Sequence, residues 1–206
     1  DGYLKDELVK IEGNREEIED RFYKTLEFGT AGLRGVLGAG TNRMNVFTVR
    51  QATAGLAEYI KKTGHTERGV VIAYDSRHFS PEFALEAAKV LCANNIKVYL
   101  FESLRPTPEL SFSVRHLHCI AGIVITASHN PAKYNGYKVY GEDGGQMPLD
   151  AANAVTEEIR KTDMLTGPAV MDEKEAVEKG LLTYIGEDVD REYLANVFAR
   201  RVNPEA

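Results

Sequence analysis

A serine and a histidine stand side by side where an apolar run ends, and both are residue types that can do chemistry. The segment Thr126-Ala127-Ser128-His129-Asn130-Pro131 directly follows the apolar residues 120–125. A serine hydroxyl is a weak nucleophile unless a base, a metal or a strongly electrophilic partner such as a phosphoryl group assists it. Neighbouring side chains of extended backbone point to opposite faces, so His129 is not necessarily the base for Ser128. The residues alone leave two alternatives, nucleophilic catalysis and an ordinary turn.

Two cationic side chains accompany this segment. Lys138 follows the turn signal Asn135-Gly136, which places a serine, a histidine and a lysine within eleven residues. Arg34 lies in the glycine-rich stretch 28–40. Glycines let backbone N–H groups approach a phosphate, and an arginine can hold one with two hydrogen bonds. The spacing matches neither the P-loop nor the dinucleotide-binding fingerprint, so a hairpin with a surface arginine explains the stretch equally well.

Alternating strands and helices are predicted to position these residues. Short β-branched or apolar runs predict strands at 69–74, 97–101, 120–126 and 137–140. Helices are expected at 3–27 (two, broken near Gly13-Asn14), 46–62, 80–94 with Ser80 as N-cap, 106–116, 149–161, 172–180 and 188–200. This order predicts an α/β domain with a largely parallel sheet. Ligands of such sheets bind beyond the carboxyl ends of the strands, here residues 75–77, 102–108 and 127–136.

The organisation weakens near Thr166-Gly167-Pro168. About forty residues remain after that break, too few for a core of their own. We therefore expect residues 1–183 to form one domain with N-terminal helices. Residues 184–206 are expected to be a connection and the first helix of a further domain.

Composition excludes several classes of protein. The chain has 206 residues, 43% of them apolar and 27% charged, which excludes intrinsic disorder, and its glycine, proline and cysteine counts exclude collagen and disulfide scaffolds. No apolar window is long enough to span a bilayer. The net charge of −6 argues against nucleic-acid or membrane partners but not against a phosphorylated substrate. Cys92 and Cys119 are expected to be core thiols, and no signal peptide is visible, which favours a reducing, cytoplasmic compartment.

The glycine-rich segment 28–35 and the serine segment 126–131 together resemble the first domain of the α-D-phosphohexomutase superfamily. Residues 75–77, 105–108 and 135–138 are similar to further elements of that family. Residues 136–146 look most like the branch that holds bacterial α-phosphoglucomutases and related phosphopentomutases. The resemblance implies a three-layer α/β/α domain with a mixed, largely parallel sheet.

The resemblance also implies roles for four residues. Ser128 matches the family serine that is phosphorylated in the resting enzyme, and its phosphate would be a ligand of Mg²⁺. Lys138 matches a lysine proposed to aid proton transfer at the sugar hydroxyl. Arg34 matches an arginine near the phosphoserine, whose expected role is either phosphate contact or support of proton transfer. His129 matches an active-site histidine that positions the phosphoserine or a substrate hydroxyl.

Other residues near these motifs have simpler interpretations. Asn130 is expected to shape the loop, and Asp75 with Arg77 to form an ion pair either at the crevice or on the open surface. His116 and His118 lie near a predicted helix end without an acid or cysteine to complete a metal site, so a helix-end position is expected for both.

The function implied by the resemblance is a phosphohexose mutase that interconverts sugar 1-phosphate and 6-phosphate, with glucose as the expected sugar, through a bisphosphate intermediate. Mg²⁺ and the sugar bisphosphate are the implied cofactors. The family's other three domains carry the aspartate-rich metal loop, the sugar loop and a phosphate loop, none of which is found here, so this chain alone is expected to be inactive and to expose an apolar surface. A phosphopentomutase, a non-catalytic phosphosugar-binding module and, least favoured, a plain scaffold are the alternatives.

Overall fold

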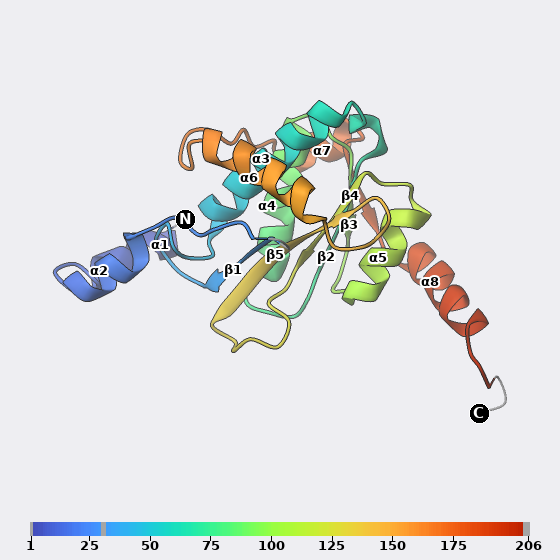
Figure 1. Ribbon diagram of the computed structural model, residues 1–206, viewed down its shortest axis with the longest axis horizontal. Coiled ribbons are helices and arrows are strands. Elements are labelled where there is room, and N and C mark those ends of the chain that lie inside the picture. Colours follow the sequence, from blue (N-terminus) through green and yellow to red (C-terminus); the bar gives the residue numbers. More distant parts are fainter. Residues whose placement is uncertain (1, 30–31, 204–206) are drawn as a thin grey trace.

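A six-stranded sheet with helices on both faces forms the centre of the molecule in a computed structural model that describes residues 2–29 and 32–203 (Figure 1). The strands follow one another across the sheet in the order β1-β5-β4-β2-β3-β6. Their bounds are β1 Gly32–Val36, β2 Val70–Tyr74, β3 Val98–Phe101, β4 Ala121–Ile125, β5 Tyr134–Gly141 and β6 Leu182–Ile185.

The sheet is mixed and largely parallel, as predicted. Strands β4, β2, β3 and β6 run parallel to one another, with Ile72 opposite Ile123 on one side of β2 and opposite Leu100 on the other. Strand β5 runs antiparallel to both β4 and β1. The carboxyl ends of β2 and β4 therefore meet at one edge of the sheet, and the segments after them carry the serine and the Asp75-Ser76-Arg77 turn.

Helices cover the two faces as separate layers. The helices are α1 Gly2–Lys10, α2 Arg15–Phe22, α3 Val46–Thr63, α4 Ser80–Ala93, α5 Thr107–His116, α6 Leu149–Lys161, α7 Glu173–Glu178 and α8 Glu187–Ala199, with a short 3-10 turn, η1, at Thr66–Arg68. Val70 and Ile72 pack with α3, α4 and α6, whereas Val71 and Ala73 pack with α5 and α8 on the other face. This two-sided burial explains why the central strands are apolar throughout.

Two strands differ from the sequence-based expectation, and a third was left open by it. Strand β1 lies inside the glycine-rich stretch, for which a hairpin with a surface arginine was one of the two alternatives, and β5 begins three residues before the expected strand 137–140. Strand β6 was not predicted at all, because Leu182-Thr183-Tyr184-Ile185 is short and exposes its two middle residues. Since β6 crosses residue 183, the boundary expected there falls inside a strand of this sheet.

The start of α4 also differs in one detail. Ser80 is the first residue of the helix rather than its N-cap, and Phe79 holds the cap position with φ 63°. The Ser80 hydroxyl donates to Asp75 Oδ1 at 2.9 Å instead of capping the helix. The serine is therefore used to fix the turn that precedes the helix.

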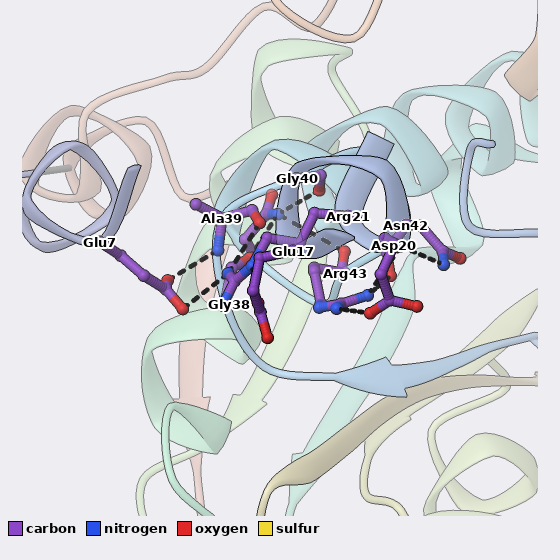
Figure 2. Close-up of polar contacts among 10 residues, drawn as sticks. Glu7, Glu17, Asp20, Arg21, Gly38, Ala39, Gly40, Asn42 and Arg43 are labelled. Atoms are coloured by element: carbon purple, nitrogen blue, oxygen red, sulfur yellow. Dashed lines mark hydrogen bonds and ion pairs between the residues drawn. The ribbon is translucent and has the colours of Figure 1, made fainter. Parts of the chain in front are cut away.

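An arginine-centred network fastens the two N-terminal helices to the loop 37–43 (Figure 2). Arg21 of α2 bonds Glu7 of α1 at 2.7 Å, Glu17 at 3.0 Å and the Ala39 carbonyl at 3.1 Å. Glu7 in turn accepts the Ala39 N–H at 2.8 Å. The break near Gly13-Asn14 that separates the helices is confirmed, and Asn14 caps α2.

The cysteines occupy the core, as expected. Cys92 and Cys119 are free and fully buried, and burial raises the pKa of Cys92 to about 11 and that of Cys119 to about 12. Within residues 2–29 and 32–203, no helix is both long enough and apolar enough to cross a bilayer.

Candidate functional site

Ser128 lies in a tight turn just beyond the carboxyl end of β4. Its backbone has φ 56°, a left-handed conformation that non-glycine residues rarely adopt. The Ser128 N–H donates to Thr126 Oγ1 at 3.0 Å, and the Asn130 N–H donates to the Ala127 carbonyl at 3.1 Å. Backbone strain of this kind persists only where the surrounding structure enforces it, and it gathers at functional sites.

The loop around Ser128 converges on the side chain of Arg77. Arg77 Nη2 donates to the carbonyls of Ser128 at 2.7 Å and Asn130 at 2.6 Å. Arg77 Nη1 donates to the carbonyls of Pro131 at 3.1 Å and Tyr134 at 3.0 Å. One guanidinium from the β2–α4 connection thus bonds four carbonyls of the segment that joins β4 to β5.

Asp75 holds the same connection from the other side. It accepts hydrogen bonds from the Arg77 N–H at 3.0 Å and from the Ser80 hydroxyl at 2.9 Å, and its Oδ2 lies 3.5 Å from Arg77 Nε. Asn135 Nδ2 donates to Ser80 Oγ at 3.0 Å. The Asp75–Arg77 ion pair is therefore confirmed, and of its two expected locations the crevice is the observed one.

His129 comes closer to Ser128 than extended backbone would allow. The left-handed turn at Ser128 brings its Oγ to 3.4 Å from His129 Nδ1. The expectation of opposite faces is wrong here because the backbone is not extended. At this distance the imidazole lies at the outer limit of hydrogen-bond reach, next to the hydroxyl.

Arg34 and Lys138 lie on one face of the neighbouring strands. Arg34 of β1 is opposite Gly136 of β5, and Lys138 is opposite Gly32, so the two cations are diagonal neighbours on that face. Arg34 Nη1 also donates to Asn130 Oδ1 at 3.1 Å, which ties β1 to the serine loop. The structure thus brings Arg34 to the serine loop, and Asn130 links the two.

Two glycines are required for this approach. Gly32 has φ 120°, and a Cβ there would lie 1.8 Å from the Tyr137 carbonyl oxygen. A Cβ on Gly136 would lie 2.6 Å from the Thr126 carbonyl oxygen and 2.9 Å from that of Leu33. Thr30 and Ala31 of the glycine-rich motif lie outside the described residues.

A cavity of about 440 Å³ opens beside the serine. Its lining combines the turn after β2 with the serine loop: Asp75, Ser76, Arg77, His78, Ser128, Asn130 and Ala132. Ser76 and His78 were not singled out from the sequence, although they lie in or next to a segment that follows a strand end. The rule that ligands bind beyond the carboxyl ends of parallel strands predicted that residues 75–77 lie at the site, but no spacing in the sequence marked Ser76 or His78 within or beside that segment.

The described residues do not make up a magnesium site by themselves. Among them, no three or more histidine, cysteine, aspartate or glutamate side chains gather where they could hold a metal ion. Asp75, the acidic residue in the lining of this cavity, is occupied by Arg77 and Ser80. His116 is the last residue of α5 and stacks on Phe112 at 5.1 Å between ring centroids, which confirms its expected helix-end position.

Comparison with known proteins identifies relatives of this chain. Residues 25–166 match the family described as phosphoglucomutase/phosphomannomutase, alpha/beta/alpha domain I. A phosphoglucomutase of Staphylococcus epidermidis is 43% identical over 201 residues, which are 94% of this chain and 36% of that protein. A phosphoglucomutase of Staphylococcus aureus is 47% identical over 159 residues, 76% of this chain and 29% of that protein.

A solved structure has the same fold. The structure of a phosphoglucomutase/phosphomannomutase family protein from Burkholderia thailandensis superposes with a TM-score of 0.64 at 23% identity, over 84% of this chain and 35% of that one. The chain therefore spans about a third of the length of the relatives it matches. The helices α1 and α2 lie before the matched residues 25–166.

Proposed function

This chain belongs to the phosphoglucomutase/phosphomannomutase family, and from that membership we propose that it is the part of a sugar-phosphate mutase that carries the phosphoryl-bearing serine. The proposed reaction interconverts a hexose 1-phosphate and 6-phosphate, with glucose as the sugar. The name shared by its relatives, phosphoglucomutase, supports glucose over a pentose.

The proposed chemistry consists of two phosphoryl transfers. Phosphorylated Ser128 gives its phosphoryl group to the free hydroxyl of the sugar monophosphate: the serine O–P bond breaks and a sugar O–P bond forms. The sugar hydroxyl proton leaves to a base, and Ser128 Oγ takes up a proton to become a hydroxyl again. The resulting bisphosphate then reverses its orientation in the site, so that its other phosphoryl group faces Ser128. In the second transfer the Ser128 hydroxyl loses its proton to a base, a serine O–P bond forms with the other phosphoryl group, and the sugar O–P bond at that position breaks. The released sugar oxygen then takes up a proton. Phosphoryl transfer depends mainly on positioning and charge, which are what this site can supply.

Four residues have proposed roles in these steps. Ser128 is the phosphoryl acceptor and donor, and His129 Nδ1, 3.4 Å from its Oγ, can hold or return the proton. Arg34 and Lys138 place two positive charges on one sheet face beside the serine loop. We propose that Arg34 contacts phosphate and that Lys138 assists proton transfer at the sugar hydroxyl.

We propose that the remaining ligands of Mg²⁺ come from parts of the protein outside this chain. The phosphate on Ser128 would give Mg²⁺ one ligand, with carboxylates from elsewhere in the protein completing the site. When bound, the ion would neutralise charge on the phosphoryl group. We also propose that this chain alone has negligible turnover, and that the protein acts in the cytoplasm, where thiols such as Cys92 and Cys119 stay reduced.

The observation that carries the proposal is the strained serine itself. Ser128 has φ 56° at the end of a fully buried strand and opens onto a cavity lined by polar residues. The test is to incubate the intact protein with glucose 1,6-bisphosphate and map the phosphorylated peptide by mass spectrometry. We expect one phosphoryl group on Ser128 and none in Ser128→Ala.

Ser76→Ala is the matched control, because Ser76 is a second serine lining the same cavity. This variant should keep the phosphoryl group on Ser128.

In the intact protein, Ser128→Ala should lower kcat by about 10⁴-fold or more. Phosphorylation elsewhere, or normal turnover by Ser128→Ala, would refute the role of the serine. Faster turnover of ribose 1-phosphate than of glucose 1-phosphate would make the protein a phosphopentomutase. Binding without any transfer would make it a phosphosugar-binding module.

A further inference from the structure

The guanidinium of Arg77 is almost enclosed by the serine loop. Its side chain is 14% exposed, and each of its two terminal nitrogens donates to two loop carbonyls. All four terminal N–H groups are therefore used within residues 128–134. No other described arginine bonds as many carbonyls of a single segment.

We propose that Arg77 is the positioning residue of the nucleophile loop, residues 126–136, and that its guanidinium sets the backbone conformation in which Ser128 presents its hydroxyl. The link to phosphoryl transfer rests on the proposed function. The link to loop conformation does not, so the two can be tested separately.

The loop has few bonds of its own to hold this conformation. Within residues 126–136 the backbone makes only the Asn130–Ala127, Tyr134–Pro131 and Thr126–Gly136 hydrogen bonds, together with the side-chain bonds Ser128–Thr126 and Gly136–Asn135, so the stretch 127–134 has two backbone bonds of its own. Four carbonyl oxygens that point at one centre repel one another unless a cation lies there. Without the guanidinium, the left-handed Ser128 would lose the contact that holds its carbonyl in place.

The geometry requires an arginine rather than any cation. The planar guanidinium separates its donors into two pairs, one for Ser128 and Asn130 and one for Pro131 and Tyr134. A lysine ammonium has three donors at a single point and cannot span both pairs of carbonyls. The substitution Arg77→Lys therefore keeps the charge and loses the geometry.

The orientation of one peptide group follows from this arrangement. No peptide bond among the described residues is cis, so the N–H of His129 points opposite to the Ser128 carbonyl that Arg77 binds. That N–H has no hydrogen-bond partner among the residues the structure describes. Arg77 thus orients a backbone donor next to Ser128 that can bind an acceptor such as a phosphoryl oxygen.

Arg77 is itself held by a chain of polar contacts. Asp75 accepts its backbone N–H at 3.0 Å and faces its Nε at 3.5 Å, and Ser80 joins Asp75 to Asn135 at the end of the loop. The β2–α4 connection therefore contacts the nucleophile loop near both of its ends, through Arg77 at Ser128 and through Ser80 at Asn135.

The first test measures backbone protection in the intact protein by hydrogen exchange. We compare Arg77→Lys and Arg77→Met with Arg68→Lys and Arg68→Met. Arg68 is a matched control because it also donates to two backbone carbonyls, those of His118 and Cys119. It lies before β2, whereas Arg77 lies after this strand, and neither carbonyl belongs to residues 126–136. We expect exchange in residues 126–136 to rise about tenfold or more in both Arg77 variants and to stay unchanged in the Arg68 variants.

The second test measures catalysis in the same proteins. A shift of the nucleophile by about 1 Å can lower a rate by about 100-fold, so kcat should fall by about that factor in Arg77→Lys while KM stays within about threefold. Guanidinium ion added to Arg77→Ala should restore part of kcat, and added to Ser128→Ala it should restore none. Such rescue is not expected from a residue that only stabilises the fold.

The outcomes separate this inference from the proposed function. Unchanged exchange in the loop of Arg77→Lys would overturn the positioning role, whatever the activity. Faster exchange with no phosphoryl group on wild-type Ser128 would leave the positioning role standing and refute the proposed function. If Arg77→Met does not fold, Arg77→Lys and the guanidinium rescue decide the question.

Discussion

Arg105 and Asp190 form a bidentate ion pair across 85 residues of sequence. Nε and Nη2 of Arg105 each lie 2.7 Å from a different carboxylate oxygen of Asp190. The pair joins the segment before α5 to α8, and Phe112 of α5 contacts Tyr193 of α8 with 5.6 Å between the ring centroids. Glu109 is 4% exposed, and its Oε1 lies 4.0 Å from Arg105 Nε without a hydrogen-bond partner among the described residues.

Glu109 should make the stability of the protein depend on pH. Burial, and then the neighbouring Asp190 carboxylate, raise the pKa of Glu109 to about 7, with Arg105 opposing them. An unfolded glutamate has a pKa of about 4.3, so between about pH 4.3 and pH 7 the folded state binds more protons than the unfolded state. The free energy of unfolding should therefore fall as pH rises through this window, by up to about 1.4 kcal/mol per pH unit.

The substitution Glu109→Gln tests this directly by urea unfolding at pH 5 and pH 8. The variant should be about as stable as wild type at pH 5 and more stable at pH 8, because a neutral amide has no charge to bury. Glu58→Gln, which alters an exposed pair with Lys61, should leave the pH dependence unchanged. A wild-type stability that rises from pH 5 to pH 7 and is matched by Glu109→Gln would contradict the prediction.

Removing the Arg21 side chain should release the N-terminal helices. The guanidinium is 13% exposed and joins Glu7, Glu17 and the Ala39 carbonyl. Arg21→Met leaves two carboxylates near a carbonyl without their cation, and we expect a loss of about 2 kcal/mol in the free energy of unfolding, with faster proteolysis within residues 2–24. Arg191→Met removes an exposed ion pair with Asp188 of the same helix and should change the free energy of unfolding by less than about 0.5 kcal/mol. Equal effects of the two substitutions would show that the network does not fasten the helices.

The sequence predicted the architecture well because its signals were local and repeated. The apolar run 120–125 and the Pro-initiated helices fixed the parallel part of the sheet, and the strand-end rule located the segments after β2 and β4. The four-carbonyl site of Arg77 could not be predicted, because carbonyl groups carry no sequence signal and their convergence depends on a left-handed residue. Strand β6 was missed because it is short and exposes its two middle residues, so that its pairing with β3 is what makes it a strand. Strand β1 was expected only through one alternative, a hairpin, because its pairing with β5 cannot be seen in its own residues.

Gly136 should not tolerate even an alanine. A Cβ there would lie 2.6 Å from the Thr126 carbonyl oxygen, and that backbone atom can move only by disturbing the start of the serine loop. We expect Gly136→Ala to lower the free energy of unfolding by about 2 kcal/mol or more. Gly141→Ala, at the other end of the same strand, meets only the mobile end of the Asp143 side chain at 3.3 Å and should cost about 1 kcal/mol or less. Thermal unfolding of the two variants side by side checks the difference, and a reversed order would refute the argument.

Replacing Ser128 by glycine should stabilise the protein. The backbone at this position has φ 56°, which is strained for serine, and glycine has no Cβ to oppose it. Ser128→Gly should raise the free energy of unfolding by about 1 kcal/mol, whereas Ser128→Ala keeps the strain and should leave it nearly unchanged. Both variants should lose phosphoryl transfer. In Ser128→Gly, stability should therefore rise while activity is lost. His118→Gly, at a second non-glycine position with φ 54°, serves as the control and should gain stability without losing phosphoryl transfer. A Ser128→Gly variant no more stable than Ser128→Ala would mean that the loop, including the bond from Arg77, favours the left-handed turn without strain. The serine would then be held at no conformational cost.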